Sequence, residues 1–163
     1  AILLATGCRP NELFAAATAE AHETYFVSGS KTEAGKNRII PVASFGLAAY
    51  QSLRAAAIES GCEKLIGAYS GNKNYDGFYR RDWKRLMESL CIEKMTPYNC
   101  RHTFVTMAVQ SGVKPEILQK IIGHADYNTT IGVYTHLQIN EILQEASKLT
   151  VTDTLQTQET KPR

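Results

Sequence analysis

The sequence of 163 residues lacks any long hydrophobic run. None of its apolar segments approaches the roughly 20 residues that a membrane-spanning helix needs, and no secretory signal peptide opens the chain. We therefore expect no membrane association. The chain begins at Ala1, inside what reads as a helix, and has no initiator methionine. This beginning indicates a fragment whose upstream part is missing.

Cysteine is scarce, and its spacing excludes the usual cysteine-rich classes. The four cysteines form neither a Cys-x-x-Cys pair nor a dense disulfide pattern. We expect reduced thiols and a cytoplasmic location. Cys91, Cys100 and His102 lack a fourth ligand at a customary zinc spacing, so we expect no metal site and no cofactor.

A strong charge of either sign is also absent, since the net charge is only +2 and the pI is near 8.4. This balance permits a nucleic-acid partner without arguing for one. A hydrophobic content of 44% is ordinary for one soluble globular domain. A chain of this length can bury on the order of 70% of the surface that it exposes when unfolded.

The residue pattern predicts an α+β protein that is mainly α-helical, with a small antiparallel sheet near the N-terminus. Two β-prone stretches, residues 23–29 and 37–42, flank the polar stretch "SKTEAGK", which reads as a turn. Before them, Gly7 is expected to end a first helix, and Pro10 to begin the next.

The rest of the chain predicts helices. Ser44 is the expected N-cap of a helix that ends at Gly61, and residues 75–90 form an amphipathic, basic segment. Further helices are expected to begin at Thr96–Pro97 and at Pro115, the second ending at Gly123. Apolar stripes mark their buried faces, including one formed by Phe104, Val105, Ala108 and Val109 and one on a last helix over 139–149. A polar tail, 150–163, follows.

Four short elements stand out by their order along the chain: "TGCRPNEL", "SKTEAGKNRIIPV", "YNCRHTF" and "IGHADYNTTIGVYTH". Taken singly, their arginines, lysine, histidine and tyrosine have ordinary structural explanations. Together and in this order they resemble the catalytic domain of the tyrosine recombinase (phage integrase) family. The resemblance covers residues 1–149 and implies that family's catalytic-domain fold.

The resemblance implies a set of roles that suits DNA strand exchange. Arg9 and Arg101 would hold the scissile phosphate, since two guanidinium forks match its oxygens and the charge that develops on them. Tyr134 would be the nucleophile, and its phosphotyrosyl ester keeps the energy of the broken bond for religation. Lys31 would protonate the leaving 5′ oxygen, and His124 would bind the phosphate or manage the proton of the nucleophile.

Other residues have supporting roles by the same resemblance. Lys36 and Arg38 compete with Lys31 for the role of general acid, but we expect them to contact flanking DNA phosphates. Glu12 is expected to orient the site by pairing with the helix start or with one of the arginines. His136 is expected to pack rather than to act chemically.

The sequence departs from the family pattern at Tyr98, where the motif usually has its first histidine. A phenol, whose pKa is near ~10, can donate to a phosphate oxygen but is a poor base, unlike an imidazole near ~6.5. Either proton transfer runs through water or His124, or the domain binds DNA without cutting it. His102 is displaced by one residue along a helix and does not replace the missing imidazole.

The expected function is therefore that of a site-specific recombinase or integrase acting on double-stranded DNA, as a tetramer on DNA and as a monomer when the domain is isolated. A type IB topoisomerase, a non-catalytic DNA-binding module of the same fold and a helical interaction domain are the alternatives. The sequence identifies neither the DNA site nor the direction of recombination.

Overall fold

The computed structural model describes residues 1–29, 37–69, 74–93, 95–123 and 139–149. Helices dominate this part of the chain, as the residue pattern predicted. The elements in order are α1 (Ile2–Thr6), α2 (Pro10–Ala15), η1 (Thr18–Glu20), β1 (Tyr25–Ser28), β2 (Arg38–Pro41), α3 (Ser44–Glu59), η3 (Leu65–Ala68), α4 (Tyr75–Gly77), η4 (Phe78–Trp83), α5 (Lys84–Ser89), α6 (Pro97–Gln110), α7 (Pro115–Ile122) and α8 (Ile139–Ser147).

The predicted small antiparallel sheet is confirmed. Strands β1 and β2 pair with Phe26 opposite Ile40 and Ser28 opposite Arg38. Phe26 and Ile40 are completely buried, so their face of the sheet belongs to the core. The stretch predicted as the turn between the strands, residues 30–36, lies outside the described residues.

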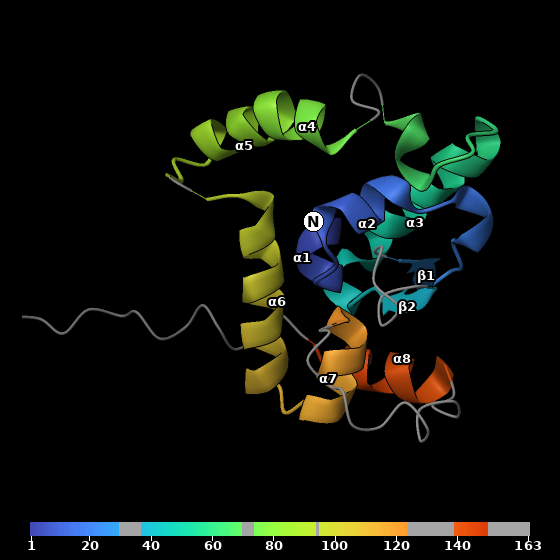
Figure 1. Cartoon of the computed structure of the whole chain (residues 1–163), viewed down its shortest axis with the longest axis vertical. Helices are drawn as coiled ribbons and strands as arrows, with labels where there is room; N and C mark the ends of the chain where they lie inside the picture. Colours follow the sequence, from blue (N-terminus) through green and yellow to red (C-terminus); the bar gives the residue numbers. More distant parts are fainter. Residues whose placement is uncertain (30–36, 70–73, 94, 124–138, 150–163) are drawn as a thin grey trace, which may run out of the picture.

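Helix α1 lies at the centre, packed against α3 and α6 (Figure 1). Gly7 ends α1 in the left-handed conformation, with φ of 59°, as predicted. A Cβ added there would lie 2.3 Å from Cδ1 of Phe104. Glycine therefore allows α6 to pack directly on the end of α1. This packing brings Arg9, two residues after Gly7, close to the first turns of α6.

Two details differ from the sequence expectation. Ser44 was predicted as an N-cap, but Ala43 takes that position and Ser44 is the first helical residue. The Ser44 hydroxyl instead donates to the carbonyl of Leu149 at 3.3 Å. Val109 was expected on the buried stripe of α6 but is 62% exposed, because Met107 occupies the buried face together with Phe104 and Ala108.

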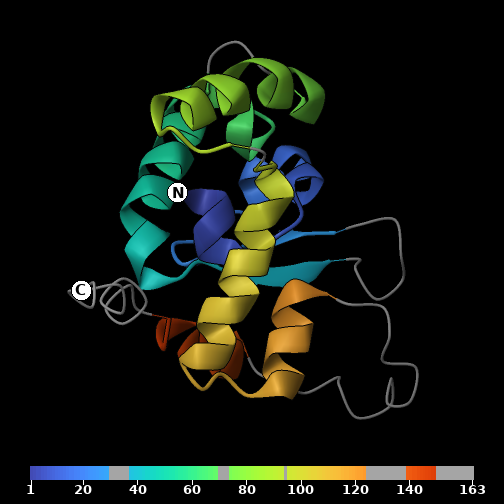
Figure 2. The same ribbon diagram turned by 90° about the vertical axis from the view of Figure 1, so that its left-hand side faces the viewer.

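Helices α7 and α8 cover the sheet on the side away from α4 and α5 (Figure 2). Both helices contact β2, and they also contact each other. The apolar face of the last helix is buried within the same chain, through Ile142, Ala146 and Leu149. The predicted end of α7 at Gly123 is confirmed by its left-handed conformation, with φ of 63°. Over the described ranges, no helix combines the length and apolarity needed to cross a membrane.

Candidate active site

Arg9 is the N-cap of α2 and lies just after the end of α1. Its backbone N–H donates to Oε2 of Glu12 at 2.7 Å, and its Nη1 donates to Oε1 of the same carboxylate at 3.2 Å. Its Nη2 donates to the carbonyl of Gly123 at 3.0 Å. The side chain is 26% exposed, so this guanidinium is oriented by the protein and still accessible from solvent.

Arg101 enters the same region from α6 and is almost completely buried. Its Nη1 donates to the carbonyl of Gly7 at 2.9 Å, and its Nη2 donates to that of Ile122 at 2.5 Å. Burial, together with the positive charges of Arg9 and Arg38, lowers the pKa of Arg101 to about 10. The group is still protonated at neutral pH.

Glu12 lies at the centre of this arginine group and is 2% exposed. Burial alone would raise the pKa of its carboxyl, but the charge and hydrogen bond of Arg38 and the contacts of Arg9 outweigh this effect and lower the pKa. The carboxylate therefore remains ionised at neutral pH. Glu12 was expected to pair with the helix start or with one arginine, and the structure places it against the N-terminus of α2 and against two arginines.

Arg38 does not lie where the sequence suggested. It was expected beside the turn, in contact with a flanking DNA phosphate, but its side chain is 6% exposed and points into the protein. Its Nη2 donates to Oε2 of Glu12 at 2.5 Å, and its Nη1 donates to the carbonyl of Ile121. Both Nη atoms are thus bound within the arginine group instead of pointing outward beside the turn, so the expected contact of Arg38 with a flanking DNA phosphate is corrected.

The three arginines meet at the C-terminal end of α7. The carbonyls of Ile121, Ile122 and Gly123 each accept a hydrogen bond from a different arginine. The last carbonyls of a helix have no partner within the helix and lie at the negative end of its dipole, which favours cations. The arrangement fixes two guanidinium groups from distant segments, Arg9 and Arg101, side by side directly before residue 124.

The remaining predicted residues are only partly covered by the structure. Tyr98 lies in the first turn of α6, is 43% exposed, and is close enough to influence the pKa of Arg101. His102 is exposed on the same helix. Five predicted residues lie outside the described residues. They are the nucleophile Tyr134, the general acid Lys31, the phosphate ligand His124, the flanking contact Lys36 and the packing residue His136.

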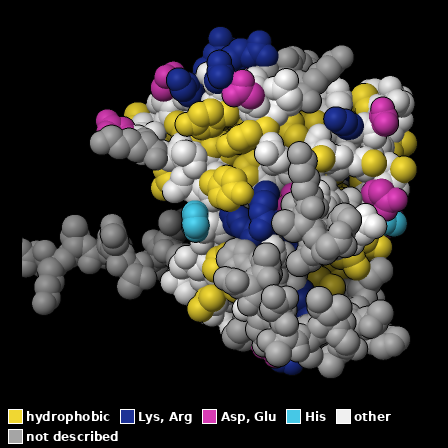
Figure 3. Space-filling model, in the orientation of Figure 1, with side chains coloured by type: hydrophobic (Ala, Val, Ile, Leu, Met, Phe, Trp, Pro, Cys, Tyr) yellow, Lys and Arg dark blue, Asp and Glu magenta, His cyan; other side chains and the backbone are white. Residues whose placement is uncertain are grey.

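The surface around the arginines is locally positive although the net charge of the chain is small. Figure 3 shows Lys and Arg side chains gathered where α6 and α7 approach α1, bordered by hydrophobic side chains. A second positive group lies on the same face over η4 and α5 (Figure 3), where four cationic residues are exposed: Arg80, Arg81, Lys84 and Arg85. This second group belongs to the segment predicted to be amphipathic and basic.

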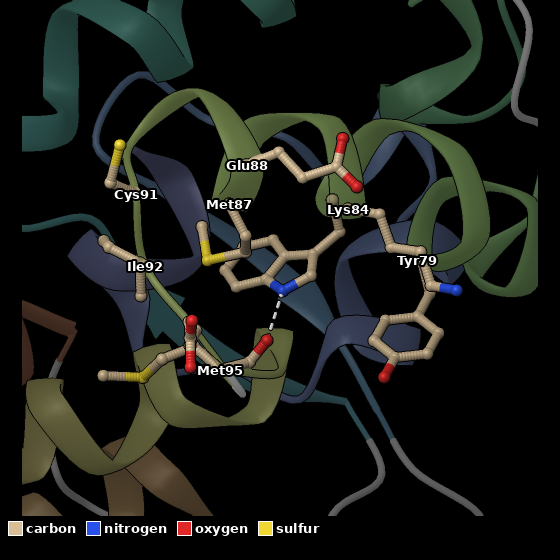
Figure 4. Close-up of a pocket in the computed structure, with 9 residues that line it drawn as sticks. Tyr79, Lys84, Met87, Glu88, Cys91, Ile92 and Met95 are labelled. Carbon is tan, nitrogen blue, oxygen red and sulfur yellow. Dashed lines mark hydrogen bonds between the residues drawn. The ribbon is translucent and has the colours of Figure 1, made fainter.

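A separate hollow of about 620 Å³ lies between α5 and the segment that leads into α6 (Figure 4). Its lining includes Trp83, Met87, Cys91 and Met95 but none of the predicted site residues. The indole Nε1 of Trp83 donates to the carbonyl of Met95 at 2.7 Å (Figure 4). This bond ties the segment before α6 to the end of η4, and so helps to place the first turn of α6, which carries Tyr98.

Sequence reasoning missed the burial of Arg38 and the role of the α7 carbonyls as acceptors. The sequence indicated Gly123 only as a helix end. A Cβ added there would lie 2.6 Å from Nε of Arg38. Glycine at this position therefore also leaves the space that the Arg38 side chain occupies.

Comparison with known proteins agrees with the fold and with the order of the motifs. Residues 1–141 match the Phage integrase family, and the chain belongs to this family. It is 31% identical over 149 residues to tyrosine recombinase XerA of Saccharolobus solfataricus, covering 90% of this chain and 47% of that protein. It is 30% identical over 146 residues to tyrosine recombinase XerD of Halalkalibacterium halodurans, covering 83% of this chain and 47% of that protein. The chain thus spans about half the length of these relatives.

Solved structures show the same fold. The crystal structure of XerA recombinase matches with a TM-score of 0.62 at 27% identity, over 88% of this chain and 53% of that chain. The Tn1549 transposon integrase in complex with circular intermediate DNA matches with a TM-score of 0.54 at 24% identity, over 88% of this chain and 54% of that chain. The mainly helical architecture with its small antiparallel sheet is therefore the catalytic-domain fold of this family.

Proposed function

We propose that residues 1–149 are the catalytic domain of a site-specific DNA recombinase or integrase, which cuts and rejoins double-stranded DNA through a 3′-phosphotyrosyl intermediate. The observation that carries this proposal is the convergence of Arg9 and Arg101 on the adjacent carbonyls of Gly123 and Ile122. Membership of the family supports it, as do the names of the XerA and XerD relatives.

The arginine pair suits the charge that the reaction creates. When a hydroxyl attacks a phosphodiester, a second negative charge develops on the non-bridging oxygens. Permanently charged guanidinium groups fixed before the reaction stabilise that charge without reorganisation. Arg101 is held by two carbonyls and contributes its positive charge from the interior, whereas Arg9 is partly exposed and can extend its free donors to a phosphate.

The remaining steps fall to residues of the family motifs. The phenol oxygen of Tyr134 attacks phosphorus, the bond to the 5′ oxygen breaks, and that oxygen takes a proton from Lys31. The proton of Tyr134 leaves through water or His124, while Tyr98 donates to a phosphate oxygen. Lys36 contacts a flanking phosphate. In the reverse reaction a 5′ hydroxyl attacks the phosphotyrosyl ester and releases Tyr134, so no external energy source is needed.

A nicked suicide DNA substrate tests the proposal, because loss of the short 5′ fragment traps the covalent adduct. The wild-type chain should form an adduct that survives denaturing electrophoresis. Tyr134→Phe removes one oxygen and leaves the ring, so it should bind DNA as wild-type does and form no adduct. An adduct formed by the Phe variant would show that another hydroxyl is the nucleophile. DNA binding without any adduct from the wild-type chain would favour a non-catalytic DNA-binding module.

A further inference from the structure

We infer that Arg38 is a positioning residue for the proposed reaction: it shares the carboxylate of Glu12, so that Glu12 orients Arg9 without neutralising it. This inference rests on the proposed function, because it concerns the same phosphate-binding arginines. Arg38 is buried at the start of β2, and its two Nη atoms are bound to Glu12 and Ile121, so it would act through other residues.

The contacts of Arg38 link three elements. A guanidinium removed from water is costly unless its charge is compensated. The two Nη atoms of Arg38 have acceptors, while its buried Nε has none among the described residues. From β2, Arg38 donates through Nη2 to Glu12 on α2 and through Nη1 to the carbonyl of Ile121 on α7. A lysine carries its charge at one nitrogen, whereas the planar fork of arginine reaches both acceptors at once.

The carboxylate of Glu12 is divided unequally between its partners. The contact with Arg38 is 2.5 Å long, whereas the contact with the Arg9 guanidinium is 3.2 Å. Without Arg38, the whole charge of a buried carboxylate would act on Arg9. We expect the Arg9 guanidinium then to be drawn onto Glu12, with fewer donors and less positive charge left for a phosphate.

The charge balance of the described cluster agrees with this role. Three guanidinium groups and the Glu12 carboxylate leave two positive charges, which match the two negative charges on the phosphorus oxygens in the transition state. Removing Arg38 would leave one. Gly123 supplies the space that Arg38 needs, since a Cβ there would meet its Nε at 2.6 Å.

The test measures the rate of adduct formation on the nicked substrate, using the full chain. Arg38→Met keeps the length of the side chain and removes the charge, and it should slow the reaction by about 10²-fold. The double variant Arg38→Met, Glu12→Gln should recover at least about tenfold of that loss, because a neutral amide does not capture Arg9. A double variant as slow as Arg38→Met would overturn the inference, because the loss would then not come from the Glu12 charge acting on Arg9.

The pH dependence supplies a second readout. In Arg38→Met the deficit relative to wild-type at the same pH should shrink as the pH falls and Glu12 becomes protonated. A deficit that stays constant would count against the inference.

A third variant covers a failure of Arg38→Met to fold, which thermal unfolding would reveal. Arg38→Lys loses the fork that reaches both acceptors. It keeps the positive charge beside Glu12 on which the inference depends, so it should remain within about tenfold of wild-type. A folded Arg38→Lys that is slower than this also overturns the inference. If the wild-type chain forms no adduct, the proposed function fails and the inference fails with it. If the wild-type chain does form the adduct but the variants do not show the expected order of rates, the inference fails while the proposed function stands.

Discussion

Tyr98 occupies the position at which the family motif has its first histidine, and the structure places it half exposed in the first turn of α6. A histidine there would meet little steric resistance and would add a group that accepts a proton near neutral pH. We expect Tyr98→His to match or exceed the wild-type rate of adduct formation. Arg101→Ala, by contrast, should lower that rate by about 10²-fold or more.

Tyr98→Phe is the matched control, since it removes only the hydroxyl. If the phenol donates to a phosphate oxygen, Tyr98→Phe should be slower than both wild-type and Tyr98→His. A Tyr98→His variant that folds but loses activity would instead assign the phenol a function that an imidazole cannot replace.

Glu12 leads to a prediction about stability and pH. The folded-state pKa of Glu12 lies below the ordinary value of a glutamate. Its contribution to the free energy of unfolding is therefore complete above that ordinary value and is lost as the pH falls towards the folded-state pKa. Glu12→Gln leaves Arg38 buried without a counter-charge and should cost about 3–5 kcal/mol at neutral pH. The difference in melting temperature between wild-type and Glu12→Gln should therefore stay constant from about pH 7 to about pH 5 and shrink as the pH falls below about 4.5.

Glu88→Gln is the control for the Glu12 prediction, because Glu88 is exposed on α5. Its melting temperature should follow that of wild-type at every pH. A Glu12→Gln difference that did not change with pH would mean that the carboxylate charge is not what stabilises the arginine cluster.

At the scale of residues, the order of the motifs predicted Arg9, Glu12 and Arg101 as site residues, and the structure places them in one group, but the sequence misplaced Arg38. A charged residue beside a polar turn is ordinarily solvated. Its burial depends on a carboxylate 26 residues earlier and on a carbonyl 83 residues later. Such long-range pairing leaves no periodic signal in the local sequence, so the burial could not be read from it.

At the scale of elements, the candidate site depends on the C-terminal end of α7. A substitution at Gly123 tests this dependence. Alanine at Gly123 would adopt a strained positive φ and place a Cβ against Arg38. Gly112 also has a positive φ, of 74°, but has nothing within 4 Å of an added Cβ. Gly112→Ala should therefore cost only the conformational strain of about 1–2 kcal/mol and keep the wild-type rate of adduct formation.

Gly123→Ala should lose more stability than Gly112→Ala, and it should also slow adduct formation, because it displaces the arginine that holds Glu12. Thermal unfolding and the suicide-substrate assay separate the two effects. Equal behaviour of the two alanine variants would show that the contact between Gly123 and Arg38 does not matter for the site.

Helix positions were predictable wherever a cap or a stop is encoded locally. Gly7, Gly61 and Gly123 all take the positive φ that a helix end favours, and Thr96 and Pro97 begin α6 as expected. The two wrong predictions concern positions whose role is set by tertiary packing. Ser44 does not cap α3; its hydroxyl instead donates to the carbonyl of Leu149, 105 residues away. Val109 continues an apolar pattern but faces outward, because α6 presents Met107 to the core instead.

At the scale of the whole molecule, the contacts of α8 bear on self-association. The sequence alone left open whether this helix folds back within its own chain or stays detached. In the structure the apolar side chains Ile142 and Ala146 of α8 are buried, as is Leu149 just after it, and α8 contacts β2 and α7. A face that is already covered is not available to a second copy. Without DNA, the chain should therefore sediment as a monomer.

Deletion of residues 138–163 should change this behaviour, because it exposes the apolar surface on which α8 lies. Each fully buried Leu or Ile side chain contributes about 1.5–3 kcal/mol, so the deletion should lower the melting temperature by on the order of 10 °C. It should also promote self-association through the exposed surface. Deletion of residues 150–163 keeps α8 and is the matched control, which should remain monomeric with little change in melting temperature. Sedimentation of all three chains decides the matter: a stable dimer of the intact chain, persisting after the longer deletion, would mean that another surface drives assembly.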